Sequence, residues 1–142
     1  MSPQQDDYRY DAFVSYELRE DTDRDWVDSV FAPHLRRNGL SLYLQPDPPW
    51  VDDVARALVN SRYAIAVLTP TYVHRLSQFP PLARALASMA ADSRCIPLYL
   101  RNCQVPAWLR AVAILDVSNS ELAEDKLEQL AMMLRTPLRA IP

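Results

Sequence analysis

The hydrophobic positions of the chain fall into short apolar runs that alternate with longer segments of helical periodicity. Each short run is rich in β-prone residues and is bounded by polar residues or proline, which is typical of a strand. The run at 63–69 is apolar almost throughout, as expected for a central strand covered on both faces. A proline inside the run at 95–100 indicates that the first half of this strand lies near a sheet edge. We expect five strands, at residues 10–16, 40–44, 63–69, 95–100 and 111–115.

The longer segments between these runs predict helices. Val27, Phe31 and Leu35 recur at four-residue steps, and Asn38 with Gly39 then supplies a helix-stop signal. We expect helices at residues 23–38, 51–60, 80–91 and 120–134, a turn or short helix at 105–109, and a less regular segment at 71–78.

The order of these elements predicts the fold class. Strands that alternate with helices imply right-handed βαβ crossovers and a mostly parallel sheet. The sequence therefore predicts an α/β fold, with a five-stranded parallel sheet flanked by helices in a flavodoxin-like strand order. Phe13, Val14, Ile65 and Val67 are expected to be buried in this sheet.

The length of 142 residues fits one domain with one core. We place that domain at residues 8–135, after a polar and flexible N-terminus at 1–7. Residues 136–142 form a tail, or the start of a linker to a further C-terminal domain. The polar N-terminus is unlike a signal peptide, and no apolar run approaches the roughly 18–20 residues that span a bilayer. These features predict a cytoplasmic protein.

Composition and charge exclude several function classes. Gly39 is the only glycine, so glycine-rich phosphate loops are excluded. The net charge of -3 argues against a nucleic-acid or anionic membrane partner. Cys95 and Cys103 are too few for a disulfide framework or a zinc cluster, and we expect reduced thiols and no metal site. His34 and His74 have no catalytic context and are expected to be structural or exposed.

Four stretches of the sequence resemble a known family. Residues 10–16, Tyr-Asp-Ala-Phe-Val-Ser-Tyr, resemble the first conserved box of Toll/interleukin-receptor (TIR) domains. Residues 25–42 are similar to the first helix and second strand of that family, and residues 61–72 to its third strand and the loop after it. Residues 96–110 are similar to the later strands of bacterial members in particular. The resemblance implies the TIR fold over about residues 8–135 and a bacterial-type member.

The resemblance also implies a partner. TIR domains act in signal transduction and innate immunity by self-association or by binding another TIR domain. Many use a loop after the second strand with the pattern Arg-Asp-x-x-Pro-Gly, which this sequence lacks. In its place stands a proline-rich loop with one tryptophan, either an interface or a loop whose tryptophan packs on the following helix. The candidate interface residues are Pro46, Asp47, Pro48, Pro49 and Trp50.

Some members of the family cleave NAD, with the glutamate of a Ser-x-Trp-Cys-x-x-Glu motif. The corresponding stretch here runs from Ser77 to Ala83, so that Ala83 stands where the glutamate is expected. A carboxylate would stabilise the developing ribosyl cation, and alanine does not. The remaining side chains form a candidate nucleotide pocket, or else serve strand-end packing and helix entry. These residues are Ser15, Tyr16, Glu17, Ser77 and Phe79.

These observations leave three functions open. The first is a TIR signalling module that self-associates, lacks the catalytic glutamate and requires no cofactor. The second is an NAD glycohydrolase inactivated at residue 83, where Ala83 is either natural or an introduced Glu→Ala change. The third is a sensor that keeps the pocket and binds a nucleotide such as NAD without cleaving it.

Overall fold

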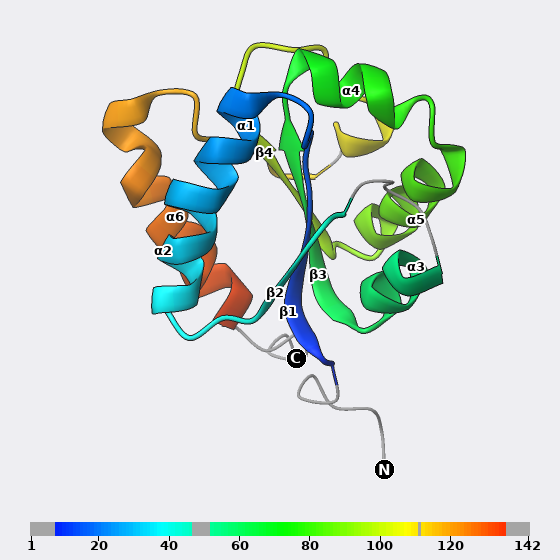
Figure 1. The fold of residues 1–142 in the computed structure, drawn as a ribbon, viewed down its shortest axis with the longest axis horizontal. Coiled ribbons are helices and arrows are strands. Elements are labelled where there is room, and N and C mark those ends of the chain that lie inside the picture. Colours follow the sequence, from blue (N-terminus) through cyan, green and yellow to red (C-terminus); the bar gives the residue numbers. More distant parts are fainter. Residues whose placement is uncertain (1–7, 47–51, 111, 136–142) are drawn as a thin grey trace.

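A computed structural model describes residues 8–46, 52–110 and 112–135 of the chain. At its centre is a five-stranded sheet in the order β2-β1-β3-β4-β5, and every neighbouring pair is parallel (Figure 1). The predicted α/β fold with a parallel sheet is confirmed. The strands are β1 (Tyr10–Ser15), β2 (Leu42–Leu44), β3 (Ser61–Leu68), β4 (Cys95–Tyr99) and β5 (Leu115–Asp116).

Helices cover both faces of this sheet (Figure 1). One face carries α1 (Asp21–Trp26), the π-helical turn η2 (Val27–Phe31), α2 (Ala32–Arg37) and α6 (Ser120–Arg135). The other face carries α3 (Asp52–Val59), α4 (Pro70–Leu76), α5 (Pro80–Ala91) and the 3₁₀ turn η3 (Ala107–Leu109). None of the helices in the described ranges is long and apolar enough to cross a bilayer.

Alternation along the strands divides the core into two layers. Val14, Ile65 and Val67 point to the layer under α2 and α6, whereas Phe13 points to the layer under α3, α4 and α5. All four side chains are at most 1% exposed, as predicted. Because both faces are covered, the central strands are apolar on both sides and their polar groups gather at the strand ends.

The predicted edge position within β4 is also confirmed. Cys95 to Tyr99 pair with β3 along the full strand, but β5 pairs only with Leu98 and Tyr99. Among the described residues, the first half of β4 therefore has a neighbour on one side only, and Pro97 lies in this half.

Two elements differ from the sequence prediction. The segment expected to be irregular at 71–78 contains the helix α4, because Thr69 caps it and Pro70 occupies its first position. The fifth strand, predicted at 111–115, is the two-residue strand Leu115–Asp116 and so shares only Leu115 with the prediction. The chain continues turning after η3, where the Val112 N–H donates to the Leu109 carbonyl, and pairing begins only at Leu115.

Candidate functional site

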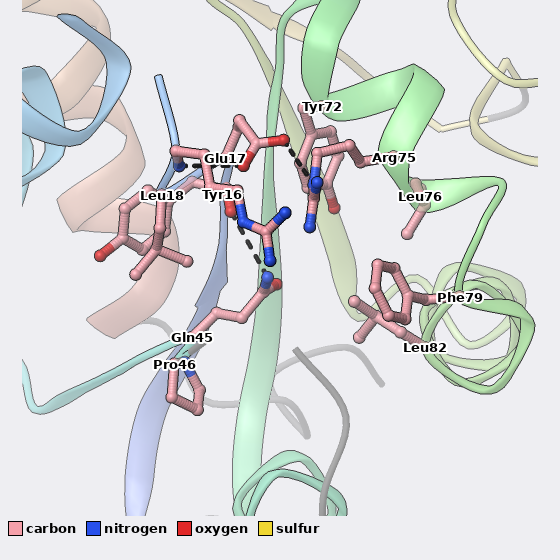
Figure 2. A pocket seen from close by; sticks show the side chains of 11 residues that line it. Tyr16, Glu17, Leu18, Gln45, Pro46, Tyr72, Arg75, Leu76, Phe79 and Leu82 are labelled. Carbon is pink, nitrogen blue, oxygen red and sulfur yellow. Dashed lines mark hydrogen bonds and ion pairs between the residues drawn. The ribbon is translucent and has the colours of Figure 1, made fainter. Parts of the chain in front are cut away.

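A small cavity lies at the carboxyl ends of β1 and β2, beside α4 (Figure 2). β1 has β2 on one side and β3 on the other, so the chain reverses its direction of winding at this point of the sheet. Open parallel sheets bind ligands at such switch points. The lining residues are Tyr16, Glu17, Leu18, Arg19, Gln45, Pro46, Tyr72, Arg75, Leu76, Phe79 and Leu82.

An ion pair crosses this cavity. The carboxylate of Glu17 lies 2.8 Å from Nε of Arg75, and the Arg75 guanidinium also stands over the ring of Phe79 at 5.7 Å (Figure 2). The Glu17 side chain is only 4% exposed, whereas that of Arg75 is 23% exposed. The other carboxylate oxygen of Glu17 accepts a hydrogen bond from the Arg19 N–H at 3.0 Å. The buried negative charge is thus compensated within the cavity wall.

Beneath the ion pair runs a buried chain of hydrogen bonds. The Tyr72 hydroxyl donates to Oγ of Ser15 at 2.8 Å, and the Ser15 hydroxyl donates in turn to Oε1 of Gln45. The Gln45 side-chain amide then contacts the Tyr16 carbonyl at 3.4 Å. Burial raises the pKa of the Tyr72 phenol far above its ordinary value, so this group stays a neutral donor. These hydrogen bonds connect α4, β1 and the end of β2.

The volume of the cavity limits what it can hold. It measures about 20 Å³, enough for roughly one water molecule. Ligand pockets generally measure about 300–1,000 Å³. The described side chains therefore leave no room for a nucleotide in this conformation, since Glu17 and Arg75 occupy the space between β1 and α4.

The structure brings some of the predicted site residues together and separates others. Tyr16, Glu17 and Phe79 line the cavity with Pro46, and Ser15 lies directly below them. Asp47, Pro48, Pro49 and Trp50 lie outside the described residues.

Ser77 and Ala83 line a second cavity of about 370 Å³, between α4 and the segment that contains η3. Trp108 and Arg110 form part of its wall, and Leu76 lines both cavities. The position expected to carry a catalytic glutamate therefore opens away from Glu17 and Arg75 rather than toward them.

The sequence model of the TIR domain matches residues 13–131. The chain belongs to the TIR domain family. Members of this family are signalling modules that typically interact with other TIR domains. The bacterial type of this TIR domain stays a prediction. No curated protein sequence matches the chain.

Solved structures share this TIR fold. The TIR domain of the Toll-related receptor TRR-2 from Hydra magnipapillata is 22% identical with a TM-score of 0.69, and the match covers 89% of this chain and 99% of that one. A TIR-STING receptor from C. gigas in complex with 2',3'-cGAMP is 17% identical with a TM-score of 0.67, covering 92% of this chain and 41% of that one. Another structure of that receptor is 19% identical with a TM-score of 0.65, covering 96% and 43%. This TIR domain thus spans less than half of the length of the two TIR-STING receptor chains.

The residues of the cavity that the sequence interpretation missed include Gln45, Tyr72 and Arg75, which take part in its ion pair and hydrogen-bond chain. Gln45 directly follows the second strand, and a polar residue at that position was a usable signal. Tyr72 and Arg75 were missed because their segment was expected to be irregular. The Thr69-Pro70 pair was a readable helix start, and a three-residue step within that helix places both side chains on one face.

No group of three or more side chains suited to a metal ion occurs in the described ranges. Of the two cysteines, Cys95 is buried at the start of β4, and burial raises the pKa of its thiol to about 12. Cys103 is partly exposed, and burial raises its thiol pKa as well. Thiols with raised pKa values are weak nucleophiles, so neither cysteine has the environment of a reactive thiol.

Proposed function

We propose that this TIR domain is an interaction module whose first partner is a second copy of itself, with another TIR domain as the alternative partner. The observation that carries this proposal is the state of the cavity at the switch point. Glu17 and Arg75 form an ion pair there, and about 20 Å³ remains. A module that acts through its surface needs no open cavity at this place.

The position of Ala83 supports the absence of NAD cleavage. The helix α5 contains no acidic residue, so it offers no carboxylate to a ribosyl cation. Glu17 is the carboxylate in the switch-point cavity, but its charge is directed to Arg75. On this proposal the chain requires no cofactor and acts in the cytoplasm in signal transduction.

One observation favours a second candidate, a nucleotide sensor without catalysis. Tyr16, Glu17, Phe79 and Arg75 do meet at the place where related folds bind ligands. Binding would require Arg75 to leave Glu17 and release the space between β1 and α4. NAD that binds this chain at millimolar concentration without turnover would favour this candidate.

Two assays test the proposal together. The purified chain is expected to self-associate in sedimentation velocity and to release no nicotinamide from NAD above background. Trp50→Ala is expected to weaken association by about 1–2 kcal/mol with an unchanged melting temperature, as for an aromatic interface anchor. Nicotinamide release by the unmodified chain would overturn the non-catalytic part of the proposal. Equal association constants for the two proteins would remove the loop from the interface.

A further inference from the structure

A further cavity, of about 230 Å³, lies between the start of β1, the strand β2 and the helix α3. It shares no lining residue with the switch-point cavity or with the cavity beside Ala83. A ligand here would therefore be independent of the candidate site at the carboxyl ends of the strands. Most of its lining side chains are polar, namely Arg9, Tyr10, Tyr43, Asp53, Arg56 and Asn60.

Backbone hydrogen bonds and ring contacts fix the framework of this cavity. The backbone N–H groups of Arg9 and Tyr10 both donate to the Asn60 carbonyl, at 2.8 and 3.1 Å. The Tyr43 ring meets the Tyr10 ring edge-on, with centroids 5.3 Å apart, and stacks on the buried ring of Phe13 at 5.6 Å. Because these groups are held in place before a ligand arrives, binding costs little conformational entropy.

Several lining side chains have hydrogen-bonding groups without a partner in the described ranges. These groups are the hydroxyls of Tyr10 and Tyr43, the guanidinium of Arg9 and the side-chain amide of Asn60. The Arg9 guanidinium lies over the Tyr10 ring, 5.9 Å from its centroid, so its N–H groups stay available. Burial, and then the nearby charge of Asp53, raises the pKa of the Tyr43 phenol, so this hydroxyl remains protonated. The cavity therefore offers donors to the acceptor atoms of a ligand.

The charge of the lining favours an anion. Arg9 and Arg56 are positive and Asp53 is negative, whereas the whole chain has a net charge of -3. The Asp53 carboxylate is already paired with Arg56, whose Nη2 lies 2.6 Å away. Among the described residues, Arg9 forms no ion pair with a carboxylate. Arg9 is therefore the cation that an anionic ligand can bind by charge-assisted hydrogen bonds.

We propose that this cavity binds a small phosphate monoester. Its donors come from β1, from β2 and from the end of α3, so they approach a ligand from several sides, as a tetrahedral oxyanion requires. A water molecule takes about 30 Å³ in the liquid, so about 230 Å³ holds a phosphate group and a few further atoms. The rings of Tyr10 and Tyr43 offer apolar surface to that organic part. A nucleotide is too large, because pockets for ligands of that size generally measure about 300–1,000 Å³.

Isothermal titration calorimetry tests the cavity, with inorganic phosphate and glycerol 3-phosphate as the probes. Both are expected to bind with a Kd of about 1 mM, the strength of a few hydrogen bonds, and the monoester at least as tightly as phosphate. Arg9→Gln removes the available positive charge and is expected to weaken binding at least about tenfold. Tyr43→Phe keeps the ring, removes the hydroxyl and is expected to weaken binding about threefold to tenfold. Arg84→Gln, which removes an exposed arginine on α5, is the matched control and is expected to change nothing.

The outcomes judge this inference separately from the proposed function. No heat of binding with either probe would overturn the site. Equal weakening by Arg9→Gln and Arg84→Gln would also overturn it, because binding would then follow the overall surface charge. Phosphate that binds more tightly than glycerol 3-phosphate would overturn the monoester as the ligand class. Arg9→Gln is expected to keep the melting temperature and the sedimentation behaviour of the unmodified chain, so the calorimetric result does not depend on self-association.

Discussion

Nε of Arg75 lies 2.8 Å from the carboxylate of Glu17, and this pair joins α4 to the carboxyl end of β1. The two residues are separated by two strands and several helices in the sequence, and they meet only because β1 and β3 are neighbours in the sheet. The pair occupies the place where an open parallel sheet would bind a ligand. The two side chains fill most of this candidate ligand pocket and connect β1 to α4.

The two members of this pair differ in burial, and we expect their substitutions to differ in cost. Arg75→Gln leaves the buried Glu17 charge uncompensated and is expected to lower the free energy of unfolding by about 3–5 kcal/mol. Glu17→Gln leaves an arginine that solvent can partly hydrate, so about 1–2 kcal/mol is expected. Urea denaturation of both variants and of the double variant measures the difference. Equal losses for the two single variants would contradict the assigned burial.

Ser15 is the central member of the buried hydrogen-bond chain, because it bonds both Tyr72 and Gln45. Ser15→Ala leaves two buried polar groups without a partner, at about 1–3 kcal/mol each. Tyr72→Phe removes one hydroxyl and leaves the Ser15–Gln45 bond intact, so a loss of about 1 kcal/mol is expected. The same denaturation assay ranks them, and a larger loss for Tyr72→Phe would show that Ser15 is not the shared member.

The two cysteines should differ in reactivity and in their effect on stability at high pH. We expect iodoacetamide to modify Cys103 well before Cys95 in the folded protein, as peptide mapping by mass spectrometry would show.

The thiol pKa of Cys95 rises from 9.0 to about 12 on folding. Between these values the unfolded chain binds fewer protons than the folded one, so stability falls as pH rises. Cys95→Ala should remove this contribution, and an unchanged slope in the variant would contradict it.

Ala83→Glu tests whether one missing carboxylate is all that separates this domain from an NAD-cleaving enzyme. We expect no nicotinamide release above background, because residue 83 lines the cavity with Trp108 and not the one with Glu17. Ala83→Gln is the matched control for the added side-chain volume. Chromatography measures the product, and clear turnover by the glutamate variant alone would favour the inactivated-enzyme hypothesis instead.

The sequence was sufficient for the sheet because its strands are apolar on both faces. Phe13, Val14, Ile65 and Val67 are buried as expected, and the parallel order follows from alternation of strands and helices. The prediction of helices failed at α4, which is marked by its capping residue Thr69 and by Pro70 rather than by hydrophobic periodicity. It also failed at the fifth strand, where pairing begins only at Leu115 and the described residues 112–114 lie outside the strand.

The candidate site was predictable only in part. Tyr16, Glu17 and Phe79 do line one cavity. The ion pair between Glu17 and Arg75, however, joins residues that are far apart in the sequence, so no local sequence pattern predicts it. The separation of Ser77 and Ala83 from these residues has the same cause. Residues two positions apart point to nearly opposite sides of a helix, so Arg75 in α4 and Ser77 at its C-terminal cap line different cavities.

Sedimentation velocity of the unmodified chain over a wide concentration range tests the central claim most directly. We predict a weight-average sedimentation coefficient that rises with protein concentration and falls back toward the monomer value in high salt. A coefficient that stays at the monomer value up to the highest attainable concentration would contradict self-association as the function of this TIR domain.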